Sequence, residues 1–105
     1  MKIITICGSM KFIEDMLTVA LKIELDGNCC LLPIYTNKAL SESEIMCLNK
    51  MHQEKIKISD AIFVVNIDGY IGNSTKKEIE FAKSLGKEII YYNDLRNEEK
   101  WKSLY

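Results

Sequence analysis

Glu78 is the residue in this sequence best placed to do chemistry. It follows Ser74 and Thr75 at the predicted start of a helix, and Gly69 and Gly72 let the chain turn tightly just before them. Such a segment brings hydroxyls, free backbone N–H groups and one carboxylate to a helix N-terminus, where open α/β sheets bind ligands. An ionised carboxylate there can act as a nucleophile at the anomeric carbon of a sugar.

The same spacing also has a purely structural interpretation. Thr75 and Glu78 stand three residues apart, as in a capping box, in which the glutamate side chain only satisfies a backbone N–H group of the helix end. From spacing alone, the capping box is favoured over a catalytic role.

Two loops are candidates for binding an anion through backbone N–H groups and hydroxyls. The first contains Cys7, Gly8, Ser9 and Met10, and the second runs from Asp68 to Thr75. Neither loop has the signature of a dinucleotide-binding or P-loop motif, and Gly and Ser are also ordinary turn residues. Tyr70, in the second loop, is a candidate for stacking on a base, although an aromatic residue there equally suits loop anchoring.

Two further side chains are candidates for moving a proton. Asp68 follows a predicted strand, although Asp before Gly is also a common turn. His52 lies four residues after Leu48 and seven after Ile45, so it is predicted to face inward, where a lone histidine more often packs than reacts. His52 is not spaced from any cysteine as a metal ligand would be, so the sequence predicts no metal site. All four cysteines are predicted to be reduced packing residues: Cys7, Cys29, Cys30 and Cys47.

Apolar strands alternate with amphipathic helices along the chain, which indicates a small, doubly wound parallel α/β sheet, Rossmann-like or flavodoxin-like, with strand order 2-1-3-4. The two loops then meet at the switch point between the first and third strands. Ser41 and Glu44 are spaced as a capping box for the second helix. The predicted strands are 2–7, 29–34, 61–67 and 88–92, and the tail 93–105 is predicted to hold a short last helix.

Size and composition limit the classes of function. The 105 residues suit one domain, 1–105, and the 48% hydrophobic and 28% charged residues are typical of a globular protein. A net charge of −1 without a basic block predicts no nucleic-acid or membrane partner. No apolar run reaches the roughly 20 residues that span a bilayer, and no signal peptide is recognisable, so we expect a cytoplasmic protein.

Four segments together resemble the nucleoside 2-deoxyribosyltransferase superfamily, which includes the 2′-deoxynucleoside 5′-phosphate N-hydrolases. The resemblance covers almost the whole chain. It rests on the combination and the order of the four segments. They are CGSMKF (7–12), SDAIFVVN (59–66), GYIGNST (69–75) and EIEFAKSLGKEI (78–89).

The resemblance implies a role for several of these residues. Glu78 matches the family nucleophile, which attacks C1′ of the deoxyribose, expels the base and forms a glycosyl-enzyme ester. Two positions differ from the family pattern: His52 is the nearest match to an aspartate that orients sugar or base, and Glu80 stands where the family has glycine. By the same resemblance, sugar or phosphate contacts fall on Gly8, Ser9, Met10, Ser74 and Thr75.

The leading hypothesis is therefore cleavage or transfer of the N-glycosidic bond of a (2′-deoxy)nucleoside or its 5′-monophosphate. Asp68 and His52 are the candidates for protonating the departing base. No cofactor is needed for this chemistry, and the resemblance implies a homodimer or larger homo-oligomer. A non-catalytic nucleotide-binding module on the same fold is the alternative, and a flavodoxin-like carrier is a third.

Overall fold

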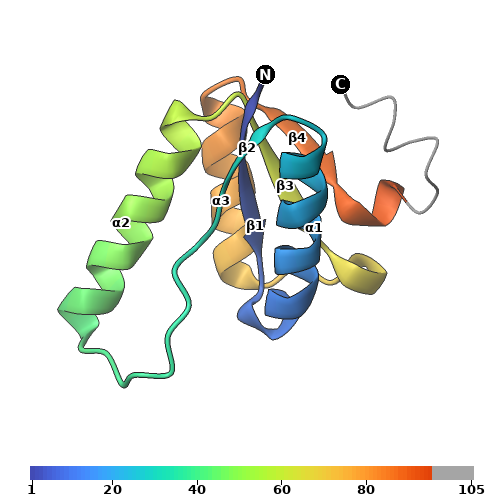
Figure 1. Cartoon of the computed structure of the whole chain (residues 1–105). Helices are drawn as coiled ribbons and strands as arrows, with labels where there is room; N and C mark the ends of the chain where they lie inside the picture. The colour runs from blue at the N-terminus through green and yellow to red at the C-terminus, as the bar shows by residue number, and fades with distance from the viewer. Residues whose placement is uncertain (96–105) are drawn as a thin grey trace.

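The computed structural model describes residues 1–95, whose four strands form one parallel sheet (Figure 1). The strand order is β2-β1-β3-β4, as the sequence predicts. In the centre, Ile4 of β1 stands opposite Ala61 of β3, and this register continues to Gly8 opposite Val65. The carboxyl ends of the two central strands therefore lie side by side. The strands are β1 (Ile3–Gly8), β2 (Cys29–Leu31), β3 (Ala61–Val65) and β4 (Glu88–Tyr91).

The central strands are apolar because both of their faces are covered. Every residue of β3 is buried, as expected for a parallel strand between two helical layers. Alternate side chains point to opposite faces, so Phe63 and Val65 face one layer while Ile62 and Val64 face the other.

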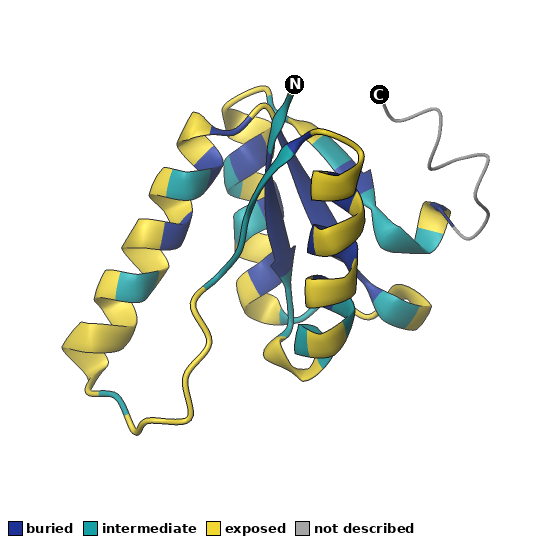
Figure 2. Cartoon of the chain, in the orientation of Figure 1, coloured by how far each residue is buried: buried dark blue, intermediate teal, exposed yellow. Residues whose placement is uncertain are grey.

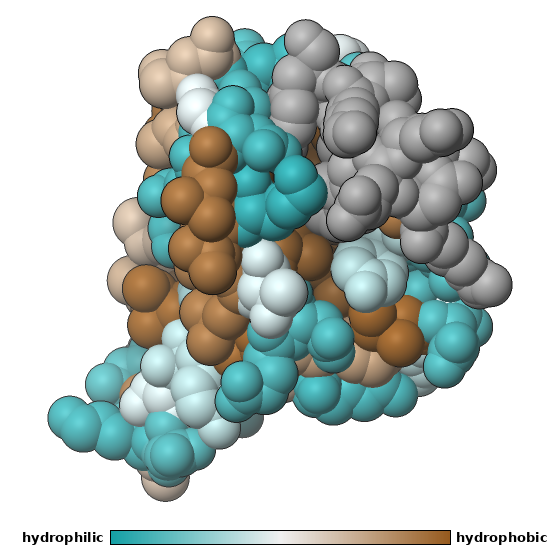
Figure 3. Space-filling model, turned by 45° about the vertical axis from the view of Figure 1, so that its right-hand side comes forward, coloured by the Kyte–Doolittle hydropathy of each residue, from teal (hydrophilic) through white to brown (hydrophobic). Residues whose placement is uncertain are grey.

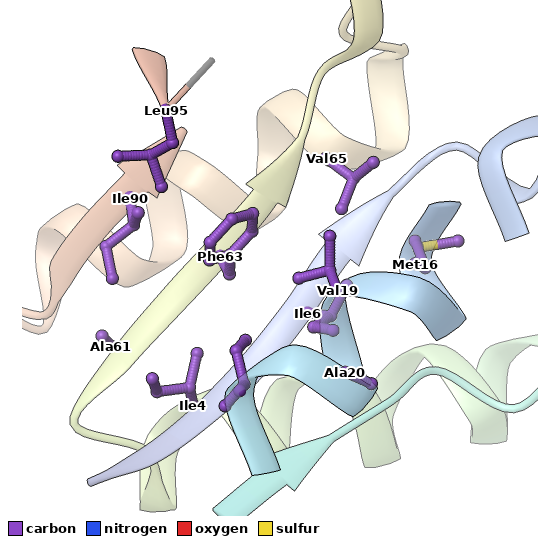
Figure 4. Packing of buried hydrophobic residues seen from close by; sticks show 11 residues of the cluster. Ile4, Ile6, Met16, Val19, Ala20, Ala61, Phe63, Val65, Ile90 and Leu95 are labelled. Atoms are coloured by element: carbon purple, nitrogen blue, oxygen red, sulfur yellow. The ribbon is translucent and has the colours of Figure 1, made fainter. Parts of the chain in front are cut away.

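One face of the sheet packs against α1 (Ile13–Leu25). This helix contributes Met16, Val19 and Ile23, which meet Phe63 and its neighbours in the larger of two hydrophobic clusters (Figure 4). The amphipathic character predicted for the helices is confirmed here, because the buried residues of α1 are Met16, Val19, Ala20 and Ile23, which recur at helical spacing.

The other face of the sheet packs against α2 (Glu42–Ile58) and α3 (Asn73–Ser84). Ile56 of α2 and Ile79 of α3 meet the sheet there. Only two of the 17 residues of α2, His52 and Ile56, are buried, and the rest of the helix is largely exposed (Figure 2). The helix therefore meets the body of the protein along a narrow line.

Several predicted boundaries are wrong, although the four predicted strands are confirmed. β2 ends at Leu31, before Pro33, because proline cannot donate to a strand ladder. β3 ends at Val65, and Ile67–Gly69 forms a 3-10 turn instead of continuing the strand. Tyr92–Asp94 is a 3-10 turn, and the rest of the predicted last helix lies outside the described residues. Within residues 1–95, no helix is both long and apolar enough to cross a membrane.

Candidate functional site

A cavity of about 550 Å³ opens at the carboxyl end of β1, between the start of α3 and the inner side of α2. This is the position where open α/β sheets bind ligands. The lining includes most of the residues that the sequence singles out: Gly8, Ser9, Met10, His52, Gly72, Ser74, Thr75 and Glu78.

Glu78 presents its carboxylate on the wall of this cavity. One oxygen, Oε1, lies 3.3 Å from Nε2 of His52, and the other, Oε2, accepts a hydrogen bond from the Ser74 hydroxyl at 3.4 Å. The Glu78 side chain is 21% exposed, so the carboxylate is held by neighbours but still open to the cavity. The arrangement orients both oxygens of one carboxylate at the mouth of a ligand-sized hollow.

The capping-box interpretation of Glu78 is wrong. α3 begins at Asn73, and its N-cap is Gly72, which makes no side-chain hydrogen bond to the helix. Thr75 is therefore already inside the helix, and Glu78 lies beyond the first turn, too far along to satisfy an N-terminal N–H group. Glu78 has no role in capping α3.

The start of α3 has the character of an anion site. The N–H groups of the first helical turn have no partner within the helix, and no side chain caps this end. Asn73, Ser74 and Thr75 occupy that turn and line the cavity. The positive end of the helix dipole and two hydroxyls thus face the same hollow as the Glu78 carboxylate.

His52 reaches the site from α2. It is 8% exposed, and its Nδ1 has no hydrogen-bond partner among the described residues. The helical spacing of Ile45, Leu48 and His52 predicts an inward-facing side chain, which is confirmed because all three line the cavity. The capping box of Ser41 and Glu44 that starts this helix is also confirmed.

Cys7 lies beneath the carboxylate and the imidazole. It is fully buried in β1, and its Sγ lies 3.5 Å from Nε2 of His52. Burial, together with the charge of Glu78 and a hydrogen bond to it, raises the pKa of the Cys7 thiol well above its ordinary value. The thiol is therefore protonated and unreactive, and it does not line the cavity, so its predicted substrate contact finds no support in the geometry.

The other cysteines differ in their surroundings. Burial is the main cause that raises the pKa of Cys30 to about 12. Cys47 is exposed on α2, so the prediction that all four cysteines are packing residues is wrong there. All four are free thiols.

Asp68, Gly69 and Tyr70 are not brought to the cavity. Asp68 is exposed, with the left-handed φ of 54° in the turn after β3. The Tyr70 ring packs edge-on against Phe12, and the Lys11 ammonium lies 3.3 Å from its centre, so Tyr70 anchors its loop to the start of α1. The roles predicted for these three residues have no support in the geometry.

Part of the lining was missed by sequence reasoning. The segment after β2 and the inner side of α2 close the apolar part of the hollow, and the helical spacing of α2 was the only signal for them. Lys55 does not offer a free cation there, because its Nζ donates to the carbonyl of Leu32 at 2.7 Å. The missed residues include Pro33, Ile34, Thr36, Leu40, Asn49, Met51 and Lys55.

Two solved structures resemble this chain in fold. The first is a 2-deoxyribosyltransferase from Leishmania mexicana, with a TM-score of 0.67 and 20% identity, over 88% of this chain and 64% of that one. The second is a CMP N-glycosidase from Clostridium botulinum, with a TM-score of 0.58 and 23% identity, over 86% of this chain and 67% of that one. The chain has the fold of these two enzymes.

This is the fold that the sequence resemblance implies, so that expectation is confirmed. The chain spans 64% of the length of the first enzyme and 67% of the second, so parts of both have no counterpart here. No protein-family model and no curated protein matches the sequence.

Proposed function

We propose that this protein cleaves or transfers the N-glycosidic bond of a (2′-deoxy)nucleoside or its 5′-monophosphate, with Glu78 as the nucleophile. The observation that carries the proposal is the position of the Glu78 carboxylate. It lies on the cavity wall beside the open start of α3, with His52 and Ser74 holding its two oxygens.

The two structural neighbours support the class of reaction. One is titled a 2-deoxyribosyltransferase and the other a CMP N-glycosidase, and both share the fold at low identity. The sequence resemblance to the same superfamily points to the same carboxylate. The fold and the sequence resemblance therefore both support a sugar-to-base bond as the target.

The reaction proceeds in two steps. A Glu78 oxygen forms a bond to C1′ as the bond from C1′ to the base nitrogen breaks, and the electron pair of that bond leaves with the base, which takes up a proton. Water then attacks C1′ in a hydrolase, or a second base attacks it in a transferase, and the carboxylate is released. Positive charge on the sugar in both transition states is stabilised by the carboxylate.

His52 is the proton donor and positioning group that the geometry supports. Its Nε2 lies 3.3 Å from the carboxylate and its ring lines the cavity, whereas Asp68, the other candidate, does not reach the cavity. A donor beside the nucleophile fixes the orientation of the carboxylate and stands within reach of a bound nucleoside.

The start of α3 would bind the 5′-phosphate of a monophosphate substrate. Uncapped N–H groups and the hydroxyls of Ser74 and Thr75 are the ligands that phosphate finds at helix N-termini. The apolar lining from α2 and the segment after β2 would then face the base.

Incubation with each deoxynucleoside and its 5′-monophosphate, with and without an acceptor base, tests the proposal. Chromatography should detect free base from at least one substrate, or a new nucleoside when an acceptor is present. A folded protein that releases no base from any of them would contradict the proposal. Tight binding without turnover would instead support the nucleotide-binding module.

A further inference from the structure

Three metal-ligand atoms from three different elements meet beneath the cavity. Cys7 comes from the end of β1, His52 from the middle of α2 and Glu78 from α3. Cys7 Sγ lies 3.5 Å from His52 Nε2, and that nitrogen lies 3.3 Å from Glu78 Oε1. All three ligand atoms lie within 4.8 Å of one another. Sequence spacing does not predict such a cluster, because its members are far apart along the chain.

These separations are close to those around a tetrahedral zinc ion. Zinc binds thiolate sulfur at about 2.3 Å and imidazole nitrogen or carboxylate oxygen at about 2.0–2.2 Å. Tetrahedral angles then place sulfur and nitrogen about 3.6 Å apart, and nitrogen and oxygen about 3.4 Å apart. Two of the three edges of the cluster are thus close to the required length, and the third, between the Cys7 sulfur and the Glu78 carboxylate oxygen, is at most 4.8 Å.

We propose that Cys7, His52 and Glu78 bind one divalent ion of the zinc class, with the fourth position open to the cavity. Sulfur, nitrogen and oxygen donors together suit zinc and exclude the hard ions magnesium and calcium. The ion enters through the cavity, which His52 and Glu78 line. It binds the Cys7 sulfur in place of the thiol proton, which passes to solvent, and it binds neutral His52 through Nε2.

Ion binding would switch off the reaction proposed above, a consequence that rests on the proposed function. Zinc bound to Glu78 would offset the negative charge of the carboxylate and hold the group toward the ion, so the carboxylate would be a weaker nucleophile at C1′ and would stabilise positive charge on the sugar less. Zinc would therefore lower the rate of base release. Inhibition by zinc, relieved by a chelator, is the expected behaviour of the active protein.

Cobalt titration tests the site without reference to activity, because Co²⁺ adopts the same geometry and is coloured. The reduced wild-type protein should bind one equivalent and show a thiolate-to-cobalt charge-transfer band, and zinc should remove that band. Cys7→Ser should lose the band, while the matched variant Cys47→Ser, changed at an exposed thiol on α2, should keep it. Absence of the band in wild type, or its persistence in Cys7→Ser, would overturn the proposal.

A second variant guards against misfolding of Cys7→Ser, whose side chain is fully buried. Glu78→Gln changes a partly exposed side chain and should weaken cobalt binding at least about tenfold, since even outer-shell changes cost that much. Unchanged affinity in a folded Glu78→Gln protein would also contradict the site. The cobalt spectrum tests the metal site even if the wild type turns over no substrate. An active enzyme that shows no thiolate-to-cobalt band would contradict the metal site and leave the proposed function intact.

Discussion

At the scale of single residues, the site depends on how Glu78 is held. His52 and Ser74 each contact one carboxylate oxygen, and the protonated Cys7 thiol lies behind them. Only the contact between Ser74 and Glu78, which lie on one helix, could be predicted from sequence spacing. The other contacts join residues that are far apart along the chain. The sequence singled out Glu78, His52 and Ser74 one by one, while their contacts follow from packing α2 and α3 on the same face of the sheet.

Ser74→Ala tests whether the start of α3 binds phosphate. The hydroxyl makes a long hydrogen bond to Glu78, at 3.4 Å, and does not cap the helix, so it is available to an anion. We expect the variant to bind a nucleoside 5′-monophosphate more weakly by about 1–2 kcal/mol, and the nucleoside almost unchanged. Calorimetric titration with both ligands measures the difference. Equal losses for both would show that Ser74 acts on Glu78 and not on phosphate.

The cysteines should differ in their reaction with an alkylating reagent. At mildly alkaline pH, Cys47 is exposed and should be modified in the native protein. Cys7 should stay unmodified, because burial and the Glu78 carboxylate raise its pKa and keep the thiol protonated. Peptide mass spectrometry after labelling, with a denatured sample as the control, measures this. Rapid native labelling of Cys7 would contradict the described packing.

At the scale of elements, α2 matters because it carries His52 while burying little else. Its first turn is held by the capping box, in which the Ser41 side chain accepts from the Glu44 N–H at 3.2 Å and the Ser41 N–H donates to the Glu44 carboxylate at 2.9 Å. These hydrogen bonds at the helix start thus support the helix that brings His52 to Glu78.

The capping box predicts a dependence of stability on pH. Hydrogen bonds from Ser41 lower the pKa of Glu44 in the folded protein below its ordinary value of 4.5. The folded state therefore holds this proton less readily than the unfolded chain, so the contribution is present above pH 4.5 and is lost as pH falls through the lower folded pKa. Glu44→Gln should show less loss of stability over that acid range in urea unfolding. An identical pH profile for both proteins would contradict the capping box.

The residue types along the chain do not determine where each helix begins and ends. The strand order followed from the alternation of apolar strands and helices, but the start of α3 did not follow from its residues. Asn73, Ser74 and Thr75 are all common at helix starts, so their types do not choose among them. The extended backbone of Gly72, with φ −74° and ψ 168°, makes it the N-cap and moves the helix start upstream. That shift removes Glu78 from the cap.

At the scale of the whole molecule, much apolar surface is exposed (Figure 3). On α2, Met46 is 70% and Ile58 64% exposed, and on α1, Leu25 is 77% exposed. The chain also spans only about two thirds of each structural neighbour, and its cavity is bounded on one side by the thinly packed α2. A second copy packed against α2 would cover this helix and help to enclose a ligand.

We therefore expect a homodimer formed through α2. Met46→Glu places a charge on that helix outside the cavity and should shift the protein to monomers, because burying an unpaired charge is costly. Leu25→Glu, at a similarly exposed position on α1, is the matched control and should remain dimeric. Sedimentation velocity of the wild type and both variants at tens of micromolar distinguishes monomers from dimers. A monomeric wild type, or dissociation only by Leu25→Glu, would contradict an interface on α2.

The central claim is that the Glu78 carboxylate attacks C1′, and base release by Glu78→Gln tests it most directly. The amide keeps the shape and can still accept from Ser74, so stability should stay within about 1 kcal/mol of wild type. The matched control is Glu80→Gln, which removes the same charge from an exposed position two residues along α3. With the best substrate of the wild type, chromatography should show base release reduced at least about a hundredfold in Glu78→Gln and nearly unchanged in Glu80→Gln. A folded Glu78→Gln protein that releases base at the wild-type rate would contradict the assignment.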